Sequence, residues 1–197
     1  MSDPLFRDPI TNDPWHAHFH AIGALTVAWN GLEHTLEYII GALLRLDHDT
    51  ASFLITNLGN VSRADLAKRL IRTNDGRTQI IELVDHLAKG YNTCRENRNI
   101  ILHSQFTINA LASKAWLVKP TRSGALNEYP ADLSTLRQVA TEVATFAGFA
   151  VDIFGAIQTD TDHVGASDSK DPQVAVWPWT WPNKPPLPRN LNPHQSD

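Results

Sequence analysis

The chain has 197 residues, 42% of them hydrophobic, with 17 basic and 21 acidic side chains and a formal charge of −4. The length suits one domain of about 150 residues with tails, and the charge argues against a protein that coats nucleic acid through bulk positive charge. A single cysteine, Cys94, excludes an internal disulfide and a Cys-x-x-Cys site for a metal or redox chemistry.

The N-terminal segment does not resemble a signal peptide. Residues 1–13 contain Pro4, Pro9 and several charged side chains but no apolar stretch, and no uninterrupted run of about 18 apolar residues follows. We therefore expect an extended arm over 1–13, no contact with a membrane, and a cytoplasmic location.

A long helix is predicted to follow this arm. Asp13-Pro14 is typical of a helix start, because an N-cap acceptor precedes a proline in the first turn. Apolar residues spaced by three and four then continue to about Leu46. The helix contains glycines that we expect to let a partner helix approach closely: Gly23, Gly31 and Gly41.

Two shorter helices are expected next. The first covers about 50–58, capped by Asp49 or Thr50. The second begins at a capping box formed by Ser62 and Asp65 and ends near Thr73.

The second half of the chain predicts two more long helices with a small hairpin between them. The helices cover about 78–103 and 131–159, and strand-forming residues within 105–119 predict the hairpin. Residues 120–130 are expected to be a loop. Together these elements predict an all-α antiparallel bundle of four to five helices over 14–159.

Residues 160–197 form a different kind of segment. The part from Pro172 onward is rich in proline and contains Trp177, Trp179 and Trp181, so it favours polyproline II over a helix. Two alternatives remain open for this tail. It docks on its own domain or on a dimer mate, or it is a ligand for another protein.

One short motif at the end of the second long helix carries candidate chemistry: Arg98-Asn99-Ile100-Ile101-Leu102-His103. Arginine presents a planar fork of donors that suits phosphate, and histidine exchanges protons near neutral pH. Such a pair is sufficient to cut RNA without a metal, because the 2′-hydroxyl of RNA is itself the nucleophile.

The spacing of the motif raises a geometric question. Residues five apart lie about 140° apart around a straight helix, so Arg98 and His103 do not easily reach one phosphate. The length of the arginine side chain, a helix end near His103, or a second copy of the helix across a dimer interface would each solve this. The spacing hints at a site made by two chains.

The motif and its setting resemble the HEPN domains, small helical bundles found in many bacterial toxins and anti-phage systems. Their signature is an arginine followed a few residues later by a histidine, commonly with Asn, Asp or His directly after the arginine. The segment 31–37, with its two glutamates, is similar to the helix that such domains carry opposite the motif. The resemblance covers roughly 14–158.

The resemblance implies a metal-independent endoribonuclease that works as a homodimer with the motif at the interface. Arg98 and His103 would be the catalytic pair and Asn99 a helper. It also implies a role as a toxin or phage-defence effector, with an antitoxin or another defence protein as partner.

Other readings of these residues stay open. Arg98 could pair with Glu33 or Glu37 and His103 could cap the helix, leaving an inactive module that binds a protein or nucleotide. Basic side chains could guide RNA to the site, or could simply be solvated: Arg69, Arg72 and Arg95. His16 and His20 have zinc-ligand spacing, but no Glu or Cys follows suitably, so neither a metal nor a cofactor is expected.

Overall fold

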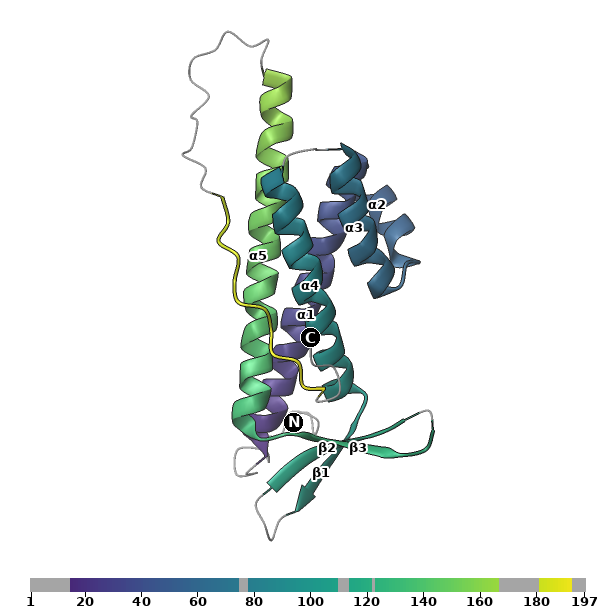
Figure 1. Cartoon of the computed structure of the whole chain (residues 1–197), viewed down its shortest axis with the longest axis vertical. Helices are drawn as coiled ribbons and strands as arrows, with labels where there is room; N and C mark the ends of the chain where they lie inside the picture. The colour runs from purple at the N-terminus through teal and green to yellow at the C-terminus, as the bar shows by residue number, and fades with distance from the viewer. Residues whose placement is uncertain (1–14, 75–77, 110–113, 122, 167–180, 193–197) are drawn as a thin grey trace, which may run out of the picture.

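The computed structural model describes residues 15–74, 78–109, 114–121, 123–166 and 181–192, without side chains for 108–109 and 159–166. This part of the chain is a helical bundle with a small antiparallel sheet at one end (Figure 1). The predicted all-α fold class is confirmed. The elements are α1 (His16–Leu44), α2 (His48–Thr56), α3 (Asn60–Asn74), α4 (Thr78–Leu102), β1 (Gln105–Asn109), β2 (Lys114–Pro120), β3 (Leu126–Pro130) and α5 (Leu133–Ala166).

The core lies between the three long helices α1, α4 and α5. Their apolar residues recur every three or four positions, so each helix buries one stripe against the others. In α1, the fully buried Trp29 packs on Tyr91 of α4, with ring centroids 5.0 Å apart. The short helices α2 and α3 lie beside one half of the bundle (Figure 1).

The glycines have two different environments. A Cβ on Gly41 would lie 2.9 Å from the Cβ of Ala51, so Gly41 allows α2 to approach α1 closely, as predicted. Within the described residues, a Cβ on Gly23 or Gly31 would meet nothing within 4 Å, so the structure shows no close helix approach at either position. Gly90 of α4 was not singled out, yet a Cβ there would lie 1.9 Å from the Phe146 ring.

The sheet has three strands in the order β1-β2-β3. The predicted hairpin corresponds to β1 and β2, but the expected loop at 120–130 is wrong, because it contains β3. Tyr129 is the one buried side chain of β3, so the segment lacks the apolar alternation typical of a strand. Pairing with β2 imposes the extended form, and Gly124, with φ of 85°, makes the turn.

Several predicted boundaries are also corrected. Asp47 caps α2, since its Oδ1 accepts from the Thr50 backbone N–H at 3.0 Å, so neither Asp49 nor Thr50 is the cap. α3 already begins at Asn60, which places Ser62 inside the helix rather than at a capping box. α5 continues to Ala166, beyond the expected end at 159. The arm at 1–13 and the Asp13-Pro14 helix start lie outside the described residues.

Residues 181–192, here called the C-terminal strap, lie along α4 and α5 of their own domain and end beside the sheet (Figure 1). Leu191 joins the hydrophobic core. Toward the other end of the strap, Lys184 pairs with Glu82 at 2.8 Å and Pro185 O lies 2.7 Å from His86 Nε2. The strap therefore docks on its own domain, which selects one of the two alternatives; Trp177 and Trp179 lie outside the described residues.

One stretch of α5 is long and apolar enough to cross a membrane, judged by length and composition alone: Leu133–Gln158. However, 44% of its most apolar window is buried within the bundle. Core helices of soluble proteins share this pattern, and the packing of α5 on α1 and α4 accounts for its apolar composition.

Candidate active site

The motif lies where α4 ends and the chain turns toward β1. α4 stops at Leu102, and His103 follows directly, with its backbone N–H still bonded to the Asn99 carbonyl at 3.3 Å. The Arg98 Nη1 atom lies 3.0 Å from His103 Nε2 and also donates to Asn99 Oδ1 at 3.1 Å. The three predicted catalytic residues therefore meet in one cluster.

The contact between Arg98 and His103 has one possible hydrogen-bond direction. A guanidinium has only donors, so Nε2 is the acceptor in this contact. The contact therefore fits the His103 tautomer that carries its proton on Nδ1. A neutral imidazole with an Nε2 lone pair is the form that a general base requires.

The cluster is open to solvent on the histidine side. His103 is exposed, whereas Arg98 is half-buried and its Nε atom has no hydrogen-bond partner in the described structure. The same holds for the hydroxyl of Ser104, the residue after His103. Buried polar atoms without partners are rare in folded proteins; those of Arg98 and Ser104 lie in or beside the motif, and others, such as Trp29 Nε1, lie elsewhere in the described structure.

The purely structural reading of Arg98 required a carboxylate from α1. Within the described residues, none pairs with Arg98, and Glu37 instead binds Arg63 of α3 at 2.7 Å. Arg98 thus keeps its positive charge available at the surface of the cluster.

Of the three ways to bring Arg98 and His103 together, two are seen within one chain, and the site made by two chains stays a prediction. The end of α4 and the reach of the arginine bring Arg98 and His103 together within one chain. A dimer is therefore not required by this distance.

The predicted RNA-binding arginines lie in two places. Arg95 is one turn before Asn99 on α4, with Nη2 3.6 Å from Glu96 Oε1. Arg72 binds Asp85 near the start of α4 at 2.6 Å, and Asp85 is about 20 Å from Arg98 along the helix axis. Arg69 is exposed on the same helix as Arg72. The structure brings Arg95, but not Arg69 or Arg72, close to the motif.

Three residues near the motif were missed by the sequence reasoning. Lys119 of β2 donates from Nζ to the Asn99 carbonyl at 3.1 Å. Asn97 of α4 is 0% exposed; its Nδ2 donates to the Arg189 carbonyl at 2.7 Å and its Oδ1 accepts from the Leu191 N–H at 2.9 Å. Asn192 follows at the end of the strap. The polar Asn97 in an otherwise apolar helix stripe was the one available signal.

Other reactive groups are held inactive. Burial raises the pKa of the Cys94 thiol to about 12, which removes its nucleophilic thiolate form at neutral pH. Burial likewise raises the pKa of the Tyr91 hydroxyl. The described residues contain no group of three or more His, Cys, Asp or Glu side chains arranged to hold a metal ion.

Comparison with family models, with curated proteins and with solved structures returned no match. The chemistry of the site therefore has to be argued from its own geometry.

Proposed function

We propose that this chain is a metal-independent endoribonuclease of the HEPN type. It would cleave RNA by attack of the 2′-hydroxyl, leaving a 2′,3′-cyclic phosphate and a 5′-hydroxyl. The observation that carries the proposal is the 3.0 Å contact between Arg98 Nη1 and His103 Nε2, exposed on the histidine side and without a paired carboxylate in the described structure.

The chemistry follows from the two side chains. An incoming phosphate draws the guanidinium fork of Arg98 to its oxygens, which frees the His103 Nε2 lone pair. Nε2 takes the proton of the 2′-hydroxyl, the 2′-oxygen bonds to phosphorus, and the bond from phosphorus to the 5′-oxygen breaks. The 5′-oxygen takes a proton from water, and His103 returns its proton to solvent.

Arg98 and Asn99 have different roles in this scheme. Arg98 stabilises the negative charge that builds on the phosphate oxygens. Asn99 Oδ1 accepts from Arg98 Nη1 and so orients the guanidinium. Asn99 is therefore a positioning residue, whereas Arg98 and His103 touch the substrate.

The biological setting belongs to the same proposal. We place the enzyme in the cytoplasm as a homodimer with the motif at the interface, acting as a toxin or anti-phage effector that an antitoxin or another defence protein restrains. Light scattering at micromolar concentration tests the dimer, and a strict monomer would remove the interface from the proposal.

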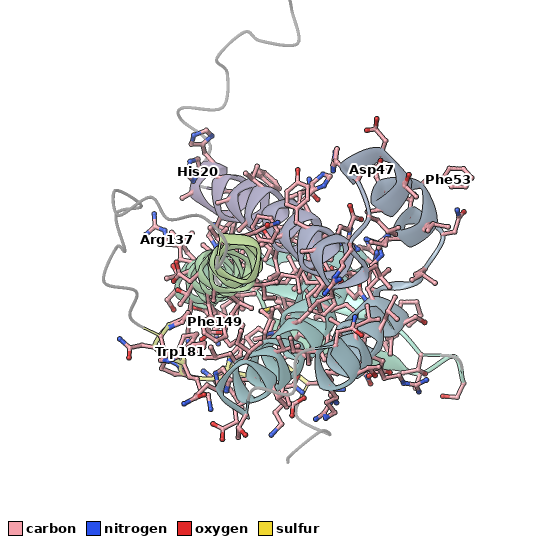
Figure 2. The ribbon with its side chains drawn as sticks, turned by 90° about the horizontal axis from the view of Figure 1, so that it is seen from above. His20, Asp47, Phe53, Arg137, Phe149 and Trp181 are labelled. Carbon is pink, nitrogen blue, oxygen red and sulfur yellow. The ribbon has the colours of Figure 1, made fainter. Side chains whose placement is uncertain are left out.

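The enzyme is tested by incubating the full chain with RNA in EDTA. Arg98→Ala and His103→Ala should each abolish cutting, while Arg137→Ala and His20→Ala, which change exposed residues on α5 and α1 (Figure 2), should not. Equal cutting by all five proteins would overturn the catalytic role of the motif. Loss of wild-type cutting in EDTA would overturn the metal-free mechanism.

A second candidate function is a catalytically inactive module that binds a partner protein. It is favoured by three exposed apolar side chains on α2 and the start of α3: Phe53, Leu54 and Val61 are 74%, 50% and 46% exposed. Figure 2 shows Phe53 pointing away from the bundle. Exposed apolar patches commonly mark interaction sites. This function predicts that Phe53→Ser weakens binding of a cognate protein while Arg98→Ala does not.

A further inference from the structure

A polar groove of about 310 Å³ lies directly beside the motif. It is bounded by the last turns of α4, by one face of the sheet, and by the end of the strap. Its lining includes Glu96, Asn99, Lys119, Asn127, Tyr129 and Asn192.

Strand register places one wall of the groove. Lys119 is opposite Asn127, and Leu117 is opposite Tyr129. Alternate residues of a strand share a face, and Leu117 and Tyr129 are both buried in the core. The side chains of Lys119 and Asn127 therefore face the bundle and the end of α4, not bulk solvent.

The groove contains one cation and one carboxylate with unused hydrogen-bonding capacity. Lys119 Nζ has three donors and spends one on the Asn99 carbonyl. Among the described residues, Glu96 makes only long contacts, 3.6 Å to Arg95 and 3.5 Å to Asn190 Nδ2. In the described structure Lys119 and Glu96 form no ion pair with each other.

We propose that this groove binds the guanine base of the nucleotide next to the cleaved phosphate; its ligand class rests on the proposed function. One edge of guanine presents the O6 acceptor beside the N1–H and N2–H donors. Glu96 accepts from the two donors, and Lys119 donates to O6. Adenine, cytosine and uracil do not offer two adjacent donors to a carboxylate. The volume lies at the small end of ligand pockets and suits a single nucleoside.

Asn99 joins the groove to the catalytic pair. Its Oδ1 accepts from Arg98 Nη1, and its backbone carbonyl accepts from Lys119 Nζ. Asn99 thus contacts both Lys119, which would hold the base, and Arg98, which would act on the phosphate of the same nucleotide. The strap completes the groove, because Asn97 fixes Leu191 and thereby sets the position of Asn192.

The proposal is tested by measuring the binding of the 3′-monophosphates of guanosine, adenosine, cytidine and uridine to the full chain by calorimetry. We expect guanosine monophosphate to bind at least about tenfold more tightly, the discrimination typical of one good bidentate base contact. Glu96→Gln and Lys119→Met should remove the preference. Glu128→Gln is the matched control, since Glu128 is exposed and on the opposite face of the same strand pair.

Two outcomes separate this proposal from the proposed function. Guanosine-selective binding that depends on Glu96, in a protein that cuts no RNA, would support the groove and overturn the ribonuclease. The second outcome is that RNA is cut next to all four bases at the same rate, by the wild type and by Glu96→Gln alike. That result would support the ribonuclease and overturn the guanine-binding role of the groove. Equal binding of the four nucleotides, or loss of selectivity in Glu128→Gln alone, would also overturn it.

Discussion

The strap should detach when Asn97 is changed to alanine. The substitution removes one partly buried hydrogen bond, from Asn97 Nδ2 to the Arg189 carbonyl, and one buried hydrogen bond, from the Leu191 N–H to Asn97 Oδ1. If the strap stayed in place, the Leu191 N–H would be buried unpaired, at a cost of about 1–3 kcal/mol.

Release of the strap is the less costly response. It gives up the burial of Leu191, about 1.5–3 kcal/mol. It also gives up the exposed Lys184–Glu82 ion pair and the contacts of Pro185 O with His86 and of the Arg189 N–H with Glu142. It regains about 1 kcal/mol or more of backbone entropy for each residue freed. The strap should therefore open well before the helical bundle unfolds.

Hydrogen exchange measures this opening. Protection of the Leu191 amide should fall about 30-fold in Asn97→Ala for a loss of about 2 kcal/mol, and trypsin should cut after Arg189 far faster than in wild type. Asn30→Ala, on the exposed face of α1, is the matched control and should change neither. Unchanged exchange at Leu191 in Asn97→Ala would refute the role of Asn97 as the clamp.

Three further predictions concern stability and reactivity. Gly90→Ala should lower the free energy of unfolding by about 1–3 kcal/mol or more, because its Cβ would overlap Phe146, whereas Gly23→Ala should raise it by up to about 1 kcal/mol through helix propensity; urea unfolding compares them, and equal effects would contradict the packing. Asp132 caps α5, and its hydrogen bonds lower the pKa of its carboxyl from 3.8 to about 2. Its stabilisation is therefore full above about pH 4 and lost as the pH falls through about 2. Asp132→Ala should cost about 0.5–2 kcal/mol at pH 6, and this difference should shrink toward pH 2; a constant difference would contradict the assignment. Cys94, buried and with its pKa raised to about 12, should resist alkylation at pH 8 until urea unfolds the chain, and rapid labelling of the native protein would show that the core opens there.

The helices could be predicted from the sequence because each long helix buries one face, so its apolar residues repeat with the helical period. Residues such as Leu25, Trp29, Leu32 and Leu36 repeat with the helical period, and each is buried in α1. β3 could not be predicted in this way, because a single buried residue, Tyr129, does not produce the alternation of apolar and polar residues that marks a strand. The pairing with β2 that makes it a strand is a tertiary interaction.

The site was accessible only in part. Arg98, Asn99 and His103 were found from residue type and spacing, but their contact depends on where α4 ends, which spacing does not reveal. Lys119 is distant in sequence and reaches Asn99 through the strand register. The docking of the strap depends on two hydrogen bonds between the Asn97 side chain and backbone atoms more than 90 residues away: Asn97 donates to the Arg189 carbonyl and accepts from the Leu191 N–H.

The most direct test of the central claim is the identity of the cut ends. A short RNA containing guanosine should be cleaved in EDTA to products ending in a 2′,3′-cyclic phosphate and a 5′-hydroxyl, as read by mass spectrometry. The same RNA with 2′-O-methyl groups at every position should stay intact, because it has no nucleophile, and His103→Ala should leave both RNAs uncut. Cleavage of the methylated RNA, or products with a 5′-phosphate, would contradict the account.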